Sequence, residues 1–424
     1  MPPPSRSEDV REYAVPLGTT APTVPFDRSE LDLAPLAQSA VVGLGEATHG
    51  TREFFRLKDR VIRALVERCG FRTIAIEAPV AGTMPADPYV FDGRGTAEGS
   101  LAEMNRWQWG TEAIRDLLEW VRSFNEGRPP TDRVRVRGID LSTPSATAER
   151  LQSVLRKFDP HLAESDAMTA LTSLEVSADG ASRRRRLDDA LTRCAAIAGR
   201  LTEGGPPDDD PGSVESWRTA RHLCRVVERN CEWHRVRHEH DGPHPAGMAT
   251  RDRLMAENVA WAAERDRGEG VVVWAHNSHV QRGTFDDGQD WTDEEAMGEH
   301  LRRGFGDRYV PLGFDFGRGS FRALGGEGSD VDGVGTFTAK GPIDGSATEP
   351  FDAMAVSPSF LELASASDDA NLEPWFARPQ AIRRIGSVYS PSAPSEERYQ
   401  RTILPESFDG VVYVRESTPS VPLA

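Results

Sequence analysis

Acidic and histidine side chains follow several short apolar runs of this sequence. The segment Gly43-Leu44-Gly45-Glu46-Ala47-Thr48-His49-Gly50 comes directly after Ala40-Val41-Val42 and sets a glutamate and a histidine three residues apart. The other side chains of this kind that end an apolar run are Glu77, Asp140, His276, His279 and Asp315. Because the carboxyl ends of parallel strands meet at one edge of a sheet, we expect these groups to share one crevice. This recurrence predicts an enzyme.

Two chemistries would use such a set of residues. In the first, His49 takes a proton from water, Glu46 or Glu77 holds its tautomer, and His276 and His279 polarise a carbonyl and stabilise the oxyanion. In the second, histidines and glutamates bind a divalent metal that activates the water. Neither an HExxH motif nor Cys/His ligand spacing is present, so we expect no metal and no cofactor, with a divalent ion as the less favoured alternative.

Each residue of the set also has a purely structural interpretation. Glu46 and His49 would then cap a helix or bond a turn, Glu77 would pair with a buried arginine, and Asp140 would bond neighbouring loops. The glycines around Glu46 and His49 favour a functional interpretation, because they permit close backbone approach to a ligand. Other catalytic patterns are missing: there is no Gly-x-Ser-x-Gly elbow and no Walker A sequence, and Gly43-Leu44-Gly45 lacks the third glycine of a dinucleotide fingerprint.

The elements that must position these residues alternate between strand and helix. Strands are predicted over 40–44, 71–76, 134–139, 271–275, 309–316 and 410–415. Helices are predicted over Phe54–Cys69, with Gly70 as its C-cap, and over Thr111–Asn125. The alternation predicts an α/β fold with a mostly parallel, twisted sheet flanked by helices.

Between about residues 144 and 267 strand signals give way to helical periodicity, which predicts an all-helical insertion. The expected organisation is an extended N-terminal arm over 1–30, an α/β catalytic core over 31–143, 268–328 and 385–418, the insertion over 144–267, and a small second α/β unit over 329–384.

Composition limits the classes of partner. The chain has 424 residues and a formal net charge of −17, which disfavours nucleic acid. No apolar run approaches the roughly 18 to 20 residues that span a bilayer, and the N-terminus lacks a signal-peptide pattern. The 4 cysteines have no CxxC spacing and are expected to be reduced. We expect a cytoplasmic protein with a small-molecule substrate; its oligomeric state is left open.

Several segments together resemble the erythromycin esterase family, over about residues 38–415. They are Gly45 to Thr51, Phe71 to Ala78, Arg251-Asp252 with Met255 to Asn258, Trp274 to His279, Met297-Gly298 with Leu301, Tyr309 to Phe316, Arg384-Ile385-Gly386, and Phe408-Asp409. The resemblance implies an α/β core with a helical insertion, a metal-independent hydrolase of macrolide lactones, and His49 as the base that activates water. Glu46 and Glu77 would be essential acids, and His276 and His279 supporting site residues.

Four further side chains are candidates for substrate binding. Lys58 stands where family members often have arginine, and it keeps the charge without two-pronged hydrogen bonding. Trp107 and Trp109 would line a pocket or pack in the core, and Asp140 is the fourth. Three alternatives to His-activated hydrolysis stay open: a dehydratase, cyclase or isomerase with the same acid–base site, a non-catalytic ligand-binding protein, and a metal hydrolase.

Overall fold

The computed structural model of the chain describes residues 6–176, 180–238, 244–265, 269–284, 294–354 and 356–423. Contacts divide it into two compact units, which are treated separately below. Unit 1 comprises Met1–Glu77, Pro85–Arg137 and Ala256–Ala424, and unit 2 comprises Ala78–Met84 and Gly138–Met255. No helix in the described ranges has both the length and the apolar character that a membrane crossing requires.

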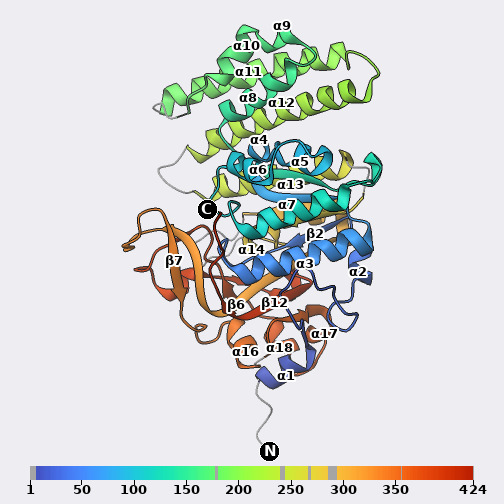
Figure 1. Cartoon of the computed structure of the whole chain (residues 1–424). Helices are drawn as coiled ribbons and strands as arrows, with labels where there is room; N and C mark the ends of the chain where they lie inside the picture. The colour runs from blue at the N-terminus through green and yellow to red at the C-terminus, as the bar shows by residue number, and fades with distance from the viewer. Residues whose placement is uncertain are drawn as a thin grey trace, which may run out of the picture. The chain divides into compact units, whose positions relative to one another are not determined.

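The strands of the chain belong almost entirely to unit 1 (Figure 1). They are β1 (Ala14–Pro16), β2 (Val41–Leu44), β3 (Thr73–Pro79), β4 (Arg135–Asp140), β5 (Val271–Trp274), β6 (Tyr309–Gly325), β7 (Val334–Ala339), β8 (Ser359–Glu362), β9 (Gln380–Arg383), β10 (Val388–Tyr389), β11 (Tyr399–Thr402) and β12 (Gly410–Ser417). Among the described residues they form a ten-stranded sheet of order β1-β8-β12-β6-β2-β5-β3-β4, with β7 and β10 beside β6, and a separate β9–β11 pair.

The centre of the large sheet is parallel. Strands β12, β6, β2, β5 and β3 all run in the same direction, whereas β8 and β7 pair antiparallel with β12 and β6. Every residue of β2, β3 and β5 is buried, which is what helices on both faces of a parallel sheet require. The predicted α/β fold with a mostly parallel sheet is confirmed.

Helices and single turns of unit 1 connect and cover these strands. They are α1 (Arg6–Tyr13), α2 (Ala34–Ala37), α3 (Arg52–Cys69), α5 (Ala86–Asp92), α6 (Ala97–Met104), α7 (Glu112–Asn125), α14 (Asn277–Val280), α15 (Met297–Phe305), α16 (Thr348–Ala353), α17 (Leu363–Ser367), α18 (Glu373–Phe376), α19 (Leu404–Ser407), η1 (Pro130–Asp132), η2 (Gly306–Arg308) and η3 (Ser395–Arg398). Helix α3 ends at Cys69, and Gly70 is its C-cap, as the sequence predicts; Gly70 has φ 78° and donates to the Leu65 carbonyl. Helix α3 packs against α7, beside which it lies in Figure 1.

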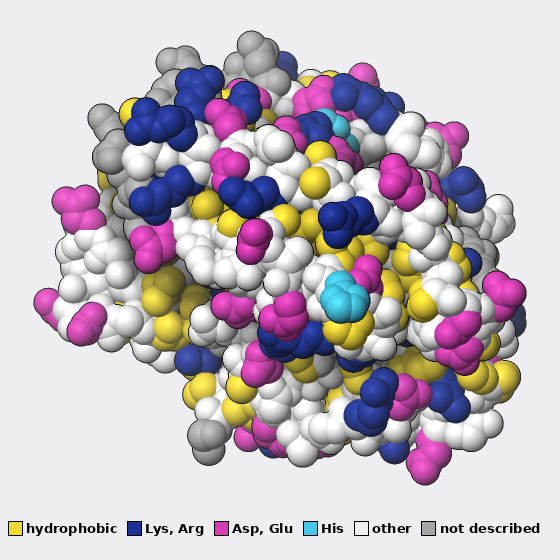
Figure 2. Space-filling model, turned by 90° about the horizontal axis from the view of Figure 1, so that it is seen from above, with side chains coloured by type: hydrophobic (Ala, Val, Ile, Leu, Met, Phe, Trp, Pro, Cys, Tyr) yellow, Lys and Arg dark blue, Asp and Glu magenta, His cyan; other side chains and the backbone are white. Residues whose placement is uncertain are grey.

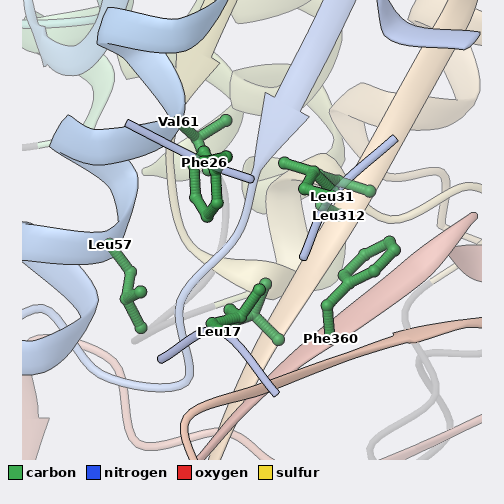
Figure 3. Close-up of a pocket in the computed structure, with 8 residues that line it drawn as sticks. Leu17, Phe26, Leu31, Leu57, Val61, Leu312 and Phe360 are labelled. Carbon is green, nitrogen blue, oxygen red and sulfur yellow. The ribbon is translucent and has the colours of Figure 1, made fainter. Parts of the chain in front are cut away.

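The N-terminal segment, predicted as an extended arm, packs on the core of unit 1. Strand β1 pairs with β8. The Arg60 guanidinium of α3 donates to carbonyls of Leu17, Thr19, Val24 and Pro25 and to the Glu30 carboxylate. An apolar cavity of about 10 Å³ lies between this segment, which contributes Leu17 and Phe26, and the elements α3 and β6 (Figure 3). It is too small and too apolar to be a substrate pocket.

Residues 329–384, predicted as a separate small unit, share the main sheet of unit 1. Their strands β7 and β8 pair with β6 and β12. The sequence showed the glycines around β7 but not the long-range pairing of β7 and β8, which is why the segment resembled an independent unit.

Unit 2 is helical. Its helices are α4 (Val80–Thr83), α8 (Pro144–Leu155), α9 (Pro160–Ala163), α10 (Asp166–Thr172), α11 (Gly180–Gly204) and α12 (Pro211–Arg237), and α13 (Pro245–Arg265) runs from unit 2 into unit 1. An apolar cluster with residues from all of the helices α4 and α8 to α12 forms its core among the described residues. On the face of the molecule in Figure 2, Lys and Arg side chains are mixed with Asp and Glu side chains.

Candidate active site

The register of four parallel strands brings the chemically active segments to one edge of the sheet. Leu44 of β2 lies opposite Trp274 of β5 and Leu312 of β6, and Ile76 of β3 also lies opposite Trp274. The residues that follow this row are therefore neighbours in space. They include Glu46 with His49, Glu77, and His276 with His279, as the apolar runs predict.

Glu46 is the centre of a buried polar cluster. Its carboxylate accepts from His49 Nδ1 at 2.7 Å, from Lys58 Nζ at 2.7 Å and from Trp274 Nε1 at 3.0 Å. Only 1% of its surface is exposed. Donors from β5, α3 and its own loop thus fix both oxygens, so the carboxylate is held rigidly against the His49 ring.

This contact assigns the tautomer of His49. A carboxylate can only accept, so the proton of the neutral ring is on Nδ1 and the lone pair is on Nε2. A buried imidazole oriented by a carboxylate through Nδ1 has the arrangement of a general base.

Lys58 supplies the counter-charge for Glu46. Its ammonium is completely buried and also donates to the Ala275 carbonyl at 3.2 Å. Burial lowers the pKa of Lys58 to about 8, and the Glu46 carboxylate opposes that shift. The ammonium is thus mostly charged at neutral pH. Lys58 acts on Glu46 in this structure, and a direct contact with substrate stays a prediction.

Glu77 and Asn277 fix the turn that carries the second histidine pair. Glu77 Oε2 accepts from the His276 backbone N–H at 2.9 Å, and Glu77 Oε1 lies 3.3 Å from His279 Nε2. The Asn277 amide exchanges two hydrogen bonds with the Phe314 backbone of β6. The turn after β5 is therefore joined to β3 and to β6.

His276 presents an N–H group with no hydrogen-bond partner among the described residues. Its Nδ1 accepts from the Ser278 backbone N–H at 3.2 Å, so the proton of the neutral ring is on Nε2. Nε2 is buried and forms no hydrogen bond of normal geometry among the described residues. The Ala47 carbonyl, which accepts from the Ile385 N–H at 2.8 Å, is close enough to the ring to raise its pKa slightly against the larger effect of burial. Burial, followed by His49 and His279, lowers the pKa of His276 well below its usual value. His276 is therefore a neutral donor beside His49, with 5.3 Å between the ring centroids.

The glycines of the His49 motif have a different role from the one predicted. A Cβ at Gly45 would lie 2.1 Å from Asn277 Oδ1, and one at Gly50 would lie 2.0 Å from the Arg322 carbonyl. They permit close approach of the chain to itself, not to a ligand, and so keep the His49 loop pressed between α14 and β6.

The other three residues predicted to bind substrate differ in burial and in hydrogen-bond partners. Trp109 is 1% exposed, packs on Trp274 at 6.0 Å and donates to the Glu77 carbonyl at 3.2 Å. Trp107 is half-buried. Asp140 belongs to unit 2, where it accepts from Arg251 Nε at 2.7 Å. Substrate contacts for these three residues stay predictions.

Asp315 follows the predicted strand pattern but lies in another polar cluster. It is fully buried and accepts from Thr348 Oγ1 at 2.6 Å. Burial raises the pKa of its carboxyl, and Arg383 opposes the shift. These contacts link β6, which contains Asp315, to α16 and β9, so the role of Asp315 in this structure is structural.

Comparison with known protein families shows which family this chain belongs to. A sequence model described as erythromycin esterase matches residues 66–417, which include Glu77, His276 and His279. The chain belongs to the erythromycin esterase family. Its sequence is 23% identical to an erythromycin esterase type II of Escherichia coli over 437 aligned positions, with 97% of this chain and 98% of that protein covered.

Two solved structures show the same fold. One, described as a succinoglycan biosynthesis protein, superposes with a TM-score of 0.81 at 21% identity and covers 98% of this chain and 97% of its own. The other is an erythromycin esterase with a histidine-to-asparagine substitution in its open conformation. It has a TM-score of 0.68 at 18% identity and covers 96% of this chain and 98% of its own. At these identities the superpositions establish the fold of the family and nothing finer.

Three residues of the cluster were not singled out from the sequence as members of the site. They are Trp274, Asn277 and Ser278. A tryptophan at the end of an otherwise all-valine strand was an available signal, because a buried indole N–H needs an acceptor. A second signal was the position of Asn277 and Ser278, two polar residues between the two candidate histidines.

The charges and donors around Glu46 bear on whether the site could hold a metal. In the ranges that the structure describes, no three His, Cys, Asp or Glu side chains are arranged to hold a metal ion. Glu46, the most central acid, already has the Lys58 ammonium at 2.7 Å, where a metal would otherwise supply the positive charge. The residues present do not fit a metal at Glu46.

Proposed function

We propose that this protein is a hydrolase that cleaves an ester or lactone of a small molecule with water activated by His49. Family membership supports the general class. The observation that carries the finer proposal is the contact of Glu46 with His49 Nδ1, which leaves Nε2 as the base. Macrolide lactones are the first substrates to test, because the Escherichia coli relative is named an erythromycin esterase.

The reaction begins with proton transfer from water. His49 Nε2 removes a proton as the water oxygen attacks the acyl carbon, and the Glu46 carboxylate stabilises the imidazolium that forms. Lys58 and Trp274 hold Glu46 in place during this step. Base catalysis of this kind contributes about 10²- to 10⁴-fold.

His276 would act on the other side of the reacting group. As the acyl C=O bond becomes an oxyanion, the Nε2–H of the neutral His276 ring can donate to it. Glu77 would fix that donor through the His276 backbone and through His279. When the tetrahedral intermediate collapses, His49 returns its proton to the leaving alkoxide, and an alcohol and a carboxylic acid result.

Turnover of macrolide lactones and 4-nitrophenyl esters in ¹⁸O-water tests the proposal. Hydrolysis places one ¹⁸O atom in the carboxylate product, whereas a dehydratase, cyclase or isomerase reaction at the same histidine incorporates none. The His49→Gln variant should lose the labelled product. Unlabelled product from the wild-type enzyme would contradict hydrolysis.

A further inference from the structure

Four polar atoms next to the His49 motif are buried without hydrogen-bond partners among the described residues. They are Thr51 Oγ1, Trp107 Nε1, Arg322 Nη1 and Ser420 Oγ. All four can donate a hydrogen bond, and two of them can only donate. Buried donors are normally paired, so a group of them in one place indicates an acceptor that the chain itself does not supply.

Backbone contacts place these residues around His49. Arg322 N–H and Ser420 N–H both donate to the Gly50 carbonyl, at 3.1 and 2.8 Å. Gly50 directly follows His49, and Thr51 comes next. Trp107 lies on the loop whose Trp109 indole donates to the Glu77 carbonyl. Thr51, Arg322 and Ser420 therefore adjoin the loop that carries the proposed base, and Trp107 contacts Arg322.

Arg322 stands out among the arginines of its strand. Its neighbour Arg318 lies 3.2 Å from Asp352 and 3.4 Å from Glu416, but Arg322 has no acidic partner in the described part of the chain. Its guanidinium carbon instead lies 5.6 Å from the centroid of the Trp107 ring. The chain has 67 acidic and 50 basic residues, so an arginine left without a carboxylate here is not explained by a shortage of acids.

Desolvation gives the physical reason to expect an anion. Arg322 is partly buried, and burial lowers the pKa of its guanidinium. A desolvated cation is stabilised by a carboxylate more than by water, and arginine matches the planar carboxylate geometry. The Trp107 indole adds a second donor from the ring that the guanidinium overlies.

We propose that Arg322 and Trp107 bind a carboxylate group of the substrate, next to the acyl group that His49-activated water attacks. The inference rests on the proposed function for the identity of the reacting group. It narrows the substrate class to esters or lactones that carry an acidic group. One carboxylate oxygen accepts from Arg322 Nη1 and the other from Trp107 Nε1.

Binding of 1-naphthoate and of its neutral analogue 1-naphthamide, measured by calorimetry on the full chain, tests this inference without any turnover. The wild type should bind the naphthoate at least about tenfold more tightly. Arg322→Gln should weaken naphthoate binding by about 10- to 100-fold, the size of a hydrogen bond to a charged group, and leave naphthamide binding unchanged. Arg322→Lys should give an intermediate value, and Trp107→Phe a smaller loss.

The exposed Arg308 provides the matched control, because Arg308→Gln removes the same charge from unit 1 at a distance from these donors. It should bind naphthoate like the wild type. Equal binding of the two wild-type ligands, absence of naphthoate binding, or an unchanged preference in a folded Arg322→Gln protein would overturn the inference. If ¹⁸O labelling fails while the Arg322-dependent preference is present, the hydrolase proposal is wrong and the carboxylate site stands.

Discussion

Each unit contains a pair of buried or partly buried histidines in contact, and the two pairs have different hydrogen-bond partners. The His49 and His276 rings of unit 1 lie 5.3 Å apart, and the His234 and His238 rings of unit 2 lie 5.6 Å apart. His49 and His234 are almost equally buried, with 4% and 5% exposed. The difference comes from their partners: His49 has the Glu46 carboxylate, whereas His234 has the Ser142 carbonyl and His238.

The partner decides whether a buried imidazole can accept a proton. In unit 2, burial, then His238, lowers the pKa of His234 to about 4, and the nearby Arg237 and Arg183 add to the effect. In unit 1, a carboxylate held by three donors is available to stabilise an imidazolium. The adjacent carboxylate, and not burial alone, is therefore the feature that distinguishes the proposed base His49 from His234.

The largest expected effect is on turnover. His49→Gln should lower kcat by about 10²- to 10⁴-fold, because the proposed base is removed. The matched variant His234→Gln, at an equally buried histidine of unit 2, should leave kcat unchanged. Steady-state kinetics on both folded variants measures the contrast. Near wild-type turnover in the His49 variant would show that the two pairs do not differ in this way.

The second prediction concerns the charge next to His49. Glu46→Gln leaves the completely buried Lys58 ammonium without a carboxylate, so the free energy of unfolding should fall by about 3 to 5 kcal/mol. The double variant Glu46→Gln/Lys58→Met removes both charges and should recover much of that stability in urea denaturation, but not the turnover. A stable single variant would show that Lys58 does not depend on Glu46.

The third prediction is a pH dependence from unit 2. The His234 pKa of about 4 in the folded chain is below its usual value of about 6.5, so the unfolded chain binds the proton first. The stabilisation is complete above about pH 6.5 and is lost as the pH falls towards 4, by about 3 kcal/mol in all. Urea denaturation across this range, compared with His234→Gln, isolates the contribution. Identical pH profiles for the two proteins would contradict it.

The smallest expected effect concerns the Asp140–Arg251 pair of unit 2. Asp140→Asn weakens a largely buried charged hydrogen bond and should lower the free energy of unfolding by about 1.5 to 3 kcal/mol. If Asp140 is structural, KM will not change; a raised KM would support its predicted role in substrate binding. Asp209→Asn, at an exposed loop residue of the same unit, is the control and should be neutral.

The sequence located the site residues that directly follow the predicted strands at 40–44, 71–76 and 271–275, but the same pattern also selected Asp140 and Asp315, whose contacts are with other residues. Apolar runs before Glu46, Glu77 and His276 predicted that these residues converge, because the register of parallel strands is set by the buried pattern. The family resemblance singled out Lys58, and its spacing from Phe54 and Val61 places it on the apolar face of the predicted helix, but the sequence did not identify a partner for its charge. Here it is buried because Glu46 stands opposite.

Other features depended on contacts between segments that are distant in sequence. The glycines at 45 and 50 were interpreted as room for a ligand, but they make room for Asn277 and Arg322. Residues 329–384 were interpreted as a separate unit because nothing local reveals that β8 pairs with β12. Such tertiary contacts have no periodic signature along the chain.

The backbone contacts of the His49 loop also have a consequence for the order of assembly. His49 is made early in synthesis, but the backbone groups that hold its neighbours come from Arg322, Ile385 and Ser420. A nascent chain that has emerged only to residue 300 contains the proposed base and its carboxylate but none of these three contacts. Unless later residues reach back to the loop, the nascent enzyme should be inactive, so activity should arise only near the end of translation.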